Sequence, residues 1–203
     1  MESPTIIHFV RHGAVYNQSD VYYGRLSGFP LSEDGRHQAS TTRDYLANKK
    51  IAAIYSSPRL RARETAQILL EPHKNILVTI SELLDEVFSP FDGAHIEEVK
   101  RLNWNVYNHG RPGYEHPEDI LARARRFIEG VRLGHCGQQV IAVTHGDPIA
   151  FLTLWVKGAA LTPQNKQALY EDSLKPGSIT SLSFHTKDNE FPQIGYVDPS
   201  QKK

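Results

Sequence analysis

Short apolar runs alternate with longer amphipathic segments along the chain. Residues 5–10 (TIIHFV), 52–55 (AAIY) and 140–144 (VIAVT) are short, rich in β-branched or aromatic side chains, and each leads toward a segment with helical patterning. Continuous apolar runs of this length are typical of strands buried on both faces of a sheet. The pattern therefore predicts a series of strand and helix units.

The longer segments carry helix-start signals, with Ser32-Glu33-Asp34 opening the first and Asp147 placed to cap another. We expect helices at residues 32–47, 58–70, 117–133 and 148–156. We expect further strands at residues 76–79, 179–185 and 193–197. Strands that alternate with helices favour parallel pairing with right-handed crossovers. The predicted fold class is α/β, a three-layer sandwich with a mostly parallel central sheet.

Residues 86–116 carry little periodicity and hold several glycines, prolines and aromatic side chains. This composition predicts an irregular excursion over one end of the sheet, where a substrate lid would lie. A chain of 203 residues is long enough for one full core and short for two. We therefore expect a single domain over residues 1–203, with the excursion at about 86–116.

The composition limits the partners and the compartment. Lys plus Arg and Asp plus Glu both number 23, which argues against a nucleic-acid or an anionic-membrane partner. The single Cys136 excludes an intrachain disulfide framework and a cysteine-based zinc site. The opening MESPTIIHFVRH does not read as a leader, and no segment approaches the roughly 18 apolar residues of a membrane span. We expect a cytoplasmic protein, and a homodimer is left open.

Basic side chains follow three of the predicted strands. Arg11 and His12 come after the first strand, an arginine-rich segment containing Arg61 follows the second, and His145 follows the run at 140–144. Ligands of open parallel sheets bind in the crevice outside the carboxyl ends of the strands. A solvated strand end would explain any one of these residues, but together they predict a local anion site at that edge.

Four blocks of the sequence resemble the histidine phosphatase superfamily, also called phosphoglycerate mutase-like. They are FVRHG at 9–13, YGRLSGFPLSEDGRHQA at 23–39, SSPRLRARETA at 56–66 and VTHGD at 143–147. Each tripeptide alone is weak, but four blocks in this order over most of the chain are specific. The resemblance implies a phosphoglycerate mutase-like fold and a phosphohistidine enzyme that uses no metal or other cofactor.

Carried over position by position, the resemblance also implies roles for five residues. His12 matches the nucleophile, Arg11 and Arg61 match the phosphate-binding arginines, and His145 matches the second histidine of the site. Glu86 matches the proton donor.

The same chemistry follows from general principles. Charge spreads over three equatorial oxygens during phosphoryl transfer, so cationic groups should surround one nucleophile. A neutral imidazole can attack phosphorus, and arginine forks fit phosphate oxygens better than a lysine. A protonated His145 would add a third cation. The leaving alkoxide needs a carboxylic acid with a raised pKa, for which Glu82 and Asp85 are rivals of Glu86.

Asn17 and Arg25 are further candidates for lining the phosphate site, although a loop asparagine is also typical of a turn. Arg59 and Arg63 flank Arg61 at two-residue spacing, so one or both are predicted to face solvent.

Four other histidines are not assigned to the site. His8 and His12 are four residues apart on a strand, so they are not a helical metal pair. His109, His116 and His135 lie among turn residues and are expected to be exposed.

The chain departs from the family pattern at four places. The spacing from His12 to Asn17 is one residue shorter than is usual, which weakens the assignment of the asparagine. Ala14 stands where many members carry an acidic residue after Arg-His-Gly, and Asp147 follows His-Gly where a second glycine is common. A Ser-Pro pair separates Glu86 from the glycine that follows it, which loosens the assignment of the acid.

The favoured function is a metal-independent phosphomonoester phosphatase that acts through phosphohistidine on a small phosphorylated metabolite. A phosphoglycerate mutase-type phosphotransferase is the first alternative, but this chain is shorter than mutases generally are between the glutamate and the last histidine block. A phosphate-binding module without turnover is a lesser alternative, suggested by Ala14. The aromatic residues of segments 16–29 and 88–104 would suit an organic group larger than glycerate, but core packing explains them equally well. The sequence does not identify the substrate itself.

Overall fold

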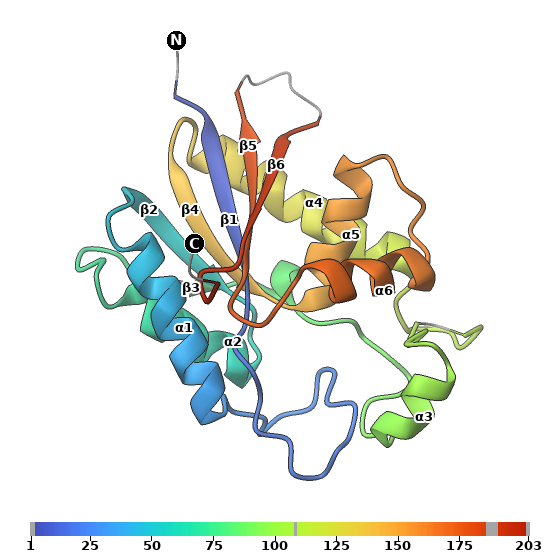
Figure 1. The fold of residues 1–203 in the computed structure, drawn as a ribbon. Helices are drawn as coiled ribbons and strands as arrows, with labels where there is room; N and C mark the ends of the chain where they lie inside the picture. The colour runs from blue at the N-terminus through green and yellow to red at the C-terminus, as the bar shows by residue number, and fades with distance from the viewer. Residues whose placement is uncertain (1–2, 108, 186–190, 202–203) are drawn as a thin grey trace.

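The computed structural model describes residues 3–107, 109–185 and 191–201. Helices cover both faces of a six-stranded sheet with the strand order β3-β2-β4-β1-β5-β6 (Figure 1). The strands are β1 (Thr5–Arg11), β2 (Ile51–Ser56), β3 (Val78–Ile80), β4 (Gln139–Thr144), β5 (Ile179–Phe184) and β6 (Gln193–Val197). The helices are α1 (Glu33–Leu46), α2 (Leu60–Leu70), α3 (Ile96–Arg101), α4 (Pro117–Gly134), α5 (Gly146–Val156) and α6 (Pro163–Asp172), with a 3-10 turn η1 (Glu82–Leu84).

The first four strands confirm the predicted parallel sheet. β1 pairs parallel with β4, and β2 pairs parallel with β4 and β3. The two closing strands form an antiparallel edge, because β5 runs opposite to β1 and β6 opposite to β5. The strand expected at 76–79 lies slightly later, at Val78–Ile80, where it pairs with the end of β2.

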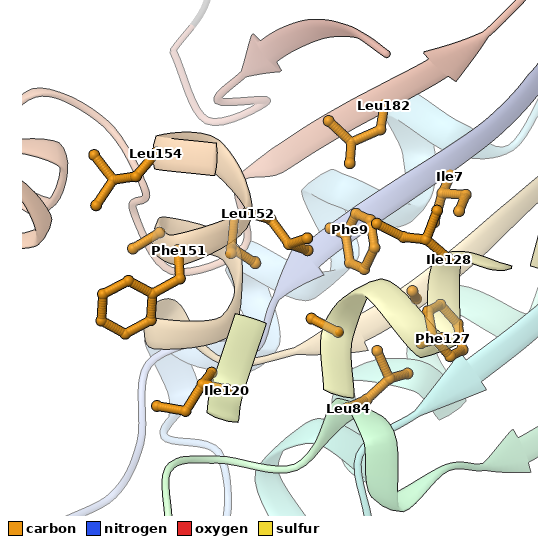
Figure 2. Packing of buried hydrophobic residues seen from close by; sticks show 14 of the residues in the cluster. Ile7, Phe9, Leu84, Ile120, Phe127, Ile128, Phe151, Leu152, Leu154 and Leu182 are labelled. Atoms are coloured by element: carbon orange, nitrogen blue, oxygen red, sulfur yellow. The ribbon is translucent and has the colours of Figure 1, made fainter. Parts of the chain in front are cut away.

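Both faces of the central strands are buried, which explains their continuous apolar runs. In β4, Val140 and Ala142 join the cluster formed with α4 and α5, whereas Ile141 and Val143 join the cluster formed with α1 and α2. Figure 2 shows Phe9 of β1 between Ile128 of α4 and Leu152 of α5. The three layers predicted from the sequence are confirmed.

The helix boundaries confirm some start signals and correct others. Ser32 caps α1, since its hydroxyl accepts a hydrogen bond from the Gly35 amide at 3.1 Å. Asp147 does not cap α5, because the helix begins at Gly146 with His145 at the cap position. Asp147 lies in the first turn instead, where tyrosine hydroxyls bind its carboxylate. The helices α3 and α6 were not predicted.

Two irregular segments meet outside the carboxyl end of β1. Residues 13–31 follow β1, and residues 86–116 carry α3, at the lower edge of the molecule in Figure 1. Val21 and His95 form an antiparallel bridge between them, and the Tyr22 amide donates to the Ala94 carbonyl at 2.8 Å. These backbone contacts join the two segments into one rim. None of the described helices is both long and apolar enough to cross a membrane.

Candidate active site

Two histidines face each other at the carboxyl ends of neighbouring strands. His12 follows β1 and His145 follows β4, and their ring centroids lie 5.1 Å apart. The parallel pairing of Arg11 with Thr144 brings them together, and the His12 amide donates to the Thr144 carbonyl at 3.1 Å. Both side chains are buried. The sheet therefore assembles this pair from residues more than 130 positions apart.

The environment of His12 fixes which ring nitrogen is free. Nδ1 lies 2.8 Å from the Gly13 carbonyl, to which it donates as an N–H, and this leaves the lone pair on Nε2. Burial, reinforced by the cations Arg61 and Arg11, holds the pKa of His12 well below its usual value of 6.5. His12 is therefore a neutral imidazole with Nε2 directed toward the arginine that could hold a phosphate.

Gly13 and Gly35 let the loop after β1 approach the start of α1. A Cβ on Gly13 would lie 2.2 Å from the Gly35 carbonyl oxygen, and a Cβ on Gly35 would lie 2.0 Å from the Ala14 carbonyl oxygen. Any side chain at either position would push the two segments apart. This close backbone contact sets the position of His12 relative to α1.

Arg61 lies at the centre of the site. Its Nε donates to His12 Nε2 at 3.2 Å, and its Nη2 donates to the Gly24 carbonyl at 2.8 Å. The guanidinium stacks on the Tyr23 ring at 4.6 Å, and only 1% of the residue is exposed. These contacts fix the planar fork beside the nucleophile, in a geometry that suits phosphate oxygens.

Arg11 supplies a second guanidinium at the end of β1. It lies 4.9 Å from the centroid of the Tyr170 ring and donates through Nη1 to the Leu174 carbonyl. Its Nε is buried and has no hydrogen-bond partner among the residues that the structure describes. A buried donor without a partner is costly, so this N–H is suited to an anionic ligand.

His145 is held by a serine on one side and faces a carboxyl group on the other. Nε2 lies 2.7 Å from the Ser57 hydroxyl, and Nδ1 lies 3.5 Å from Oε2 of Glu86. Burial, followed by the nearby Arg61, holds the pKa of His145 well below 6.5. In the ligand-free site His145 is therefore a neutral hydrogen-bonding group, and it would add a third cation only once it is protonated.

Glu86 is the carboxyl group closest to the histidine pair. Its Oε2 lies 3.7 Å from Arg61 Nη2, and its Oε1 accepts from the Val87 amide at 3.0 Å. Burial and the negative charge of Asp147 raise the pKa of Glu86 to about 7, against the opposing effect of Arg61. A carboxyl group with this pKa holds a proton near neutral pH and can donate it.

The backbone at Glu86 is clamped by two arginines. Arg123 Nη2 donates to the Glu86 carbonyl at 3.1 Å, and Arg25 Nε donates to the same oxygen at 2.7 Å. Glu115 pairs with both arginines, at 2.7 Å from Arg123 and 3.0 Å from Arg25. Glu115 also exchanges two hydrogen bonds with Phe88, whose amide donates to its carboxylate and whose carbonyl accepts from its amide. The backbone of Glu86, at the start of the irregular segment, is therefore held in a fixed position.

The rival carboxylates occupy different environments. Glu82 is exposed in the first turn of η1. Asp85 is buried, but both of its oxygens accept from Arg59 at 2.9 Å. Arg59 is thus engaged in a bidentate ion pair, whereas Arg63 is exposed as predicted for one of the two flanking arginines. Of the three candidate acids, Glu86 is the one beside His12 and His145.

Asn17 and Arg25 are not brought to the histidine pair in this structure. The Asn17 side chain donates to the Val21 carbonyl at 2.9 Å, which is turn geometry. Arg25 faces Glu115 and the Glu86 backbone.

The four histidines that the sequence did not assign to the site lie away from the histidine pair. His109 and His116 are exposed as expected, and His135 is half-buried with Nε2 at 2.9 Å from the Tyr55 hydroxyl. His8 bonds Ser181 and Gln139 on the sheet.

A cleft of about 230 Å³ opens over His12, Arg11 and Glu86. Its other lining residues come from the rim and from α6, and six of them are Tyr22, Ile96, Trp104, Val106, Lys166 and Tyr170. The aromatic segments 16–29 and 88–104 were expected to contribute to the pocket, whereas α6 was not. A Cβ on Gly146 would lie 1.9 Å from the Tyr170 hydroxyl, so the glycine after His145 admits this ring to the cleft.

The spacing of His12, Glu86 and His145 alone would admit a metal ion, because one ligand atom from each lies within 4.8 Å of the others. The guanidinium of Arg61 lies in the same place, at 3.2 Å from the His12 nitrogen and 3.7 Å from the Glu86 oxygen. A divalent cation at these three atoms would be repelled by this buried positive charge. The donor set does not fit a metal, and it suits an anion.

The chain is similar to known proteins in both sequence and fold. The family model for the histidine phosphatase superfamily (branch 1) matches residues 7–195. An uncharacterized protein of Mycobacterium tuberculosis is 34% identical over 169 residues, which cover 79% of this chain and 83% of that protein. The uncharacterized phosphatase PhoE of Bacillus subtilis is 28% identical over 156 residues, covering 76% and 78%.

The fold comparison covers almost the whole chain. The native structure of a mycobacterial glucosyl-3-phosphoglycerate phosphatase superposes with a TM-score of 0.77 at 25% identity, covering 96% of this chain and 98% of that one. The chain belongs to the histidine phosphatase superfamily.

Proposed function

We propose that the protein is a phosphomonoester phosphatase that needs no metal and forms a phosphohistidine on His12. The observation that carries the proposal is the contact of Arg61 Nε with His12 Nε2 at 3.2 Å, beside a Glu86 carboxyl whose pKa is raised to about 7. A neutral nucleophile, a fixed cation and a protonated acid are the three groups that cleavage of a phosphate ester requires. Relatives named as phosphatases support the same reaction class.

The first step transfers the phosphoryl group to the protein. His12 Nε2 attacks phosphorus while the ester P–O bond breaks, and Glu86 gives its proton to the departing alkoxide oxygen. Arg61 and Arg11 offset the charge of the phosphoryl oxygens. The Gly13 carbonyl accepts a hydrogen bond from the Nδ1–H of His12 at 2.8 Å. This hydrogen bond stabilises the positive charge that develops on the ring.

The second step returns the site to its initial state. The Glu86 carboxylate takes a proton from water, the oxygen of that water attacks phosphorus, and the Nε2–P bond breaks. The electron pair returns to Nε2, so His12 is again neutral when inorganic phosphate leaves. Each step thus uses the same acid in opposite directions.

Replacement of His12 tests the proposal. His12→Ala should reduce p-nitrophenyl phosphate turnover to background, while Arg63→Ala, at an exposed arginine two residues from Arg61, should keep it. Labelled substrate quenched on the wild-type protein should give an acid-labile phosphoryl group at His12. Label on a serine, or more than trace activity in His12→Ala, would overturn the mechanism.

The same protein preparation separates the alternatives. Interconversion of phosphoglycerates without release of inorganic phosphate would indicate a mutase-type phosphotransferase. Retained phosphate binding without turnover of any ester would indicate a binding module.

A further inference from the structure

The lining of the cleft contains a further charged group, which the phosphoryl chemistry does not use. Lys166 of α6 lines the cleft, although only 3% of the residue is exposed. Its Nζ donates to the Trp104 carbonyl at 2.9 Å and lies 3.4 Å from Oδ2 of Asp147. An ammonium carries three N–H groups, so one remains for a ligand oxygen in the cleft.

Asp147 is a fully engaged anion beside this lysine. Its Oδ1 accepts from the Tyr170 hydroxyl at 2.7 Å, and its Oδ2 accepts from the Tyr107 hydroxyl at 2.9 Å. The Lys166 ammonium also lies 5.0 Å from the Tyr107 ring centroid. Asp147 thus offsets the charge of Lys166 and fixes its position on the wall.

A charge count of the cleft leaves two positive charges. Arg11, Arg61 and Lys166 are cations, Asp147 is an anion, and Glu86 is protonated below its pKa of about 7. The arginines behind the site have their own partners: Arg59 pairs with Asp85, and Arg25 and Arg123 pair with Glu115. Two net positive charges match one phosphoryl dianion and leave none for a second acidic group.

The remainder of the wall is uncharged. Tyr22, Ile96, Trp104 and Val106 supply apolar surface, and Gln167 supplies an amide. The cleft volume of about 230 Å³ lies below the range of about 300–1,000 Å³ that is typical of ligand pockets. The space therefore suits a short alcohol.

We propose that the cleft selects phosphomonoesters of small, uncharged alcohols, with a substrate hydroxyl that accepts from Lys166, and that it disfavours a second anionic group on the substrate. The proposal rests on the phosphatase function and adds the class of the leaving alcohol. A carboxylate in place of that hydroxyl would meet the Lys166 N–H but also the nearby negative charge of Asp147, which already occupies Lys166, and an apolar wall. Desolvating an ion without full compensation weakens its binding.

Glycerol 3-phosphate and 3-phosphoglycerate form a matched pair for the test, because one carries a hydroxymethyl group where the other carries a carboxylate. We expect calorimetry on His12→Ala, which binds without turnover, to show glycerol 3-phosphate bound at least about tenfold more tightly. Equal or tighter binding of 3-phosphoglycerate would overturn the proposal. So would the failure of both esters to bind under conditions where inorganic phosphate binds.

A variant that removes the charge of Asp147 provides a second test. Asp147→Asn frees the charge of Lys166, so the affinity ratio should shift by about tenfold toward 3-phosphoglycerate. Glu97→Gln is the matched control, because Glu97 also pairs with a lysine, Lys100, at 2.6 Å, but on the exposed surface of α3. The ratio should not change in this control. An unchanged ratio in folded Asp147→Asn would contradict the charge argument. If this variant does not fold, the binding of the two esters to His12→Ala still decides the proposal.

Failure of this proposal is distinguishable from failure of the phosphatase function. Turnover of p-nitrophenyl phosphate by the wild-type protein reports the function and is insensitive to the alcohol hydroxyl. Turnover of p-nitrophenyl phosphate together with tighter binding of 3-phosphoglycerate would rule out the proposed class of alcohol but not the phosphatase function.

Discussion

The Nε–H of Arg61 donates to Nε2 of His12 across 3.2 Å, so the free nucleophile already contacts the cation that is placed to bind the phosphoryl group. A phosphate oxygen can take over the N–H when substrate binds, which frees the Nε2 lone pair for attack. Burial is the main reason that His12 stays neutral, and the contact reinforces it, because a protonated ring would face a buried guanidinium.

Arg61→Lys should therefore damage catalysis although it keeps the charge. A lysine cannot donate to His12 and to the Gly24 carbonyl while stacking on Tyr23, as the guanidinium does. We expect kcat/KM on p-nitrophenyl phosphate to fall by about two to three orders of magnitude, in line with the loss of one preorganised donor. Arg63→Lys, on the exposed face of the same helix, is the control and should match the wild type. A mild effect at Arg61 would mean that charge alone suffices.

Glu86→Gln should separate substrates by their leaving group. An alkyl phosphate needs a proton on the departing oxygen, so its turnover should fall by about two to four orders of magnitude. The nitrophenolate of p-nitrophenyl phosphate departs without help and should be affected much less. Equal losses on both substrates would assign Glu86 a positioning role. Glu82→Gln, at an exposed carboxylate, should leave both rates unchanged.

The rate on an alkyl phosphate should decline as the pH rises through about 7. Burial and Asp147 raise the pKa of Glu86 from 4.5 to about 7, so the acid keeps its proton below that pH and loses it above. The pKa of His12 is lowered well below 6.5, so its neutral form persists on the acid side and produces no loss of rate near pH 6.5. Profiles of kcat/KM should show the alkaline decline in the wild type and a flat alkaline limb in Glu86→Gln. An alkaline limb that survives in the variant would belong to another group.

Turnover should survive excess EDTA. Arg11 and Arg61 supply the positive charge that a divalent ion provides in metal-dependent phosphatases, and Arg61 lies where a metal at His12 and Glu86 would sit. The measurement is p-nitrophenyl phosphate hydrolysis after dialysis against chelator. Loss of activity that one added divalent ion restores would show that the guanidinium moves aside for a metal.

Gly35→Ala should destabilise the protein by about 2–3 kcal/mol, because its Cβ would overlap the Ala14 carbonyl oxygen at 2.0 Å. Gly130→Ala is the matched control, since this helical glycine has open space around it. Alanine is more favourable than glycine inside a helix, so the control variant should be more stable than the wild type by about 0.5–1 kcal/mol. Denaturant unfolding measures both. Equal stability of Gly35→Ala and the wild type would mean that the loop after β1 relaxes freely.

The sheet was predictable because its strands are buried on both faces and are therefore continuous apolar runs. The helix α4 was predictable from its apolar stripe, whereas α6 was not, since Lys166 and Leu169 are its only buried residues and leave no such stripe. The helix α3 has six residues, which is too short to show a clear periodicity among the glycines and prolines of its segment. The start of α5 was misplaced because Asp147 looks like a cap but serves as an acceptor for Tyr107 and Tyr170.

Some residues of the candidate site were likewise predictable from the sequence, and others were not. Arg11, His12 and His145 were found because residues that follow parallel strands meet at one edge. Arg123 was missed, although it shares the buried stripe of α4 with Ile120 and Phe127, where an arginine signals a buried partner. Lys166 and Tyr170 had no signal in the sequence, because only the tertiary structure brings α6 to the cleft.

The bonds between Phe88 and Glu115, together with the arginine clamp on the Glu86 backbone, have a consequence for protein engineering. They close the irregular segment at its base, so its two ends are tied together next to the acid. Only exposed positions of such a segment tolerate replacement, and Val99, Val106 and Tyr107 are buried in the core. A library that aims to change the accepted alcohol should therefore vary single positions that line the cleft, such as Ile96, and keep these buried residues, so that the proton donor keeps its place.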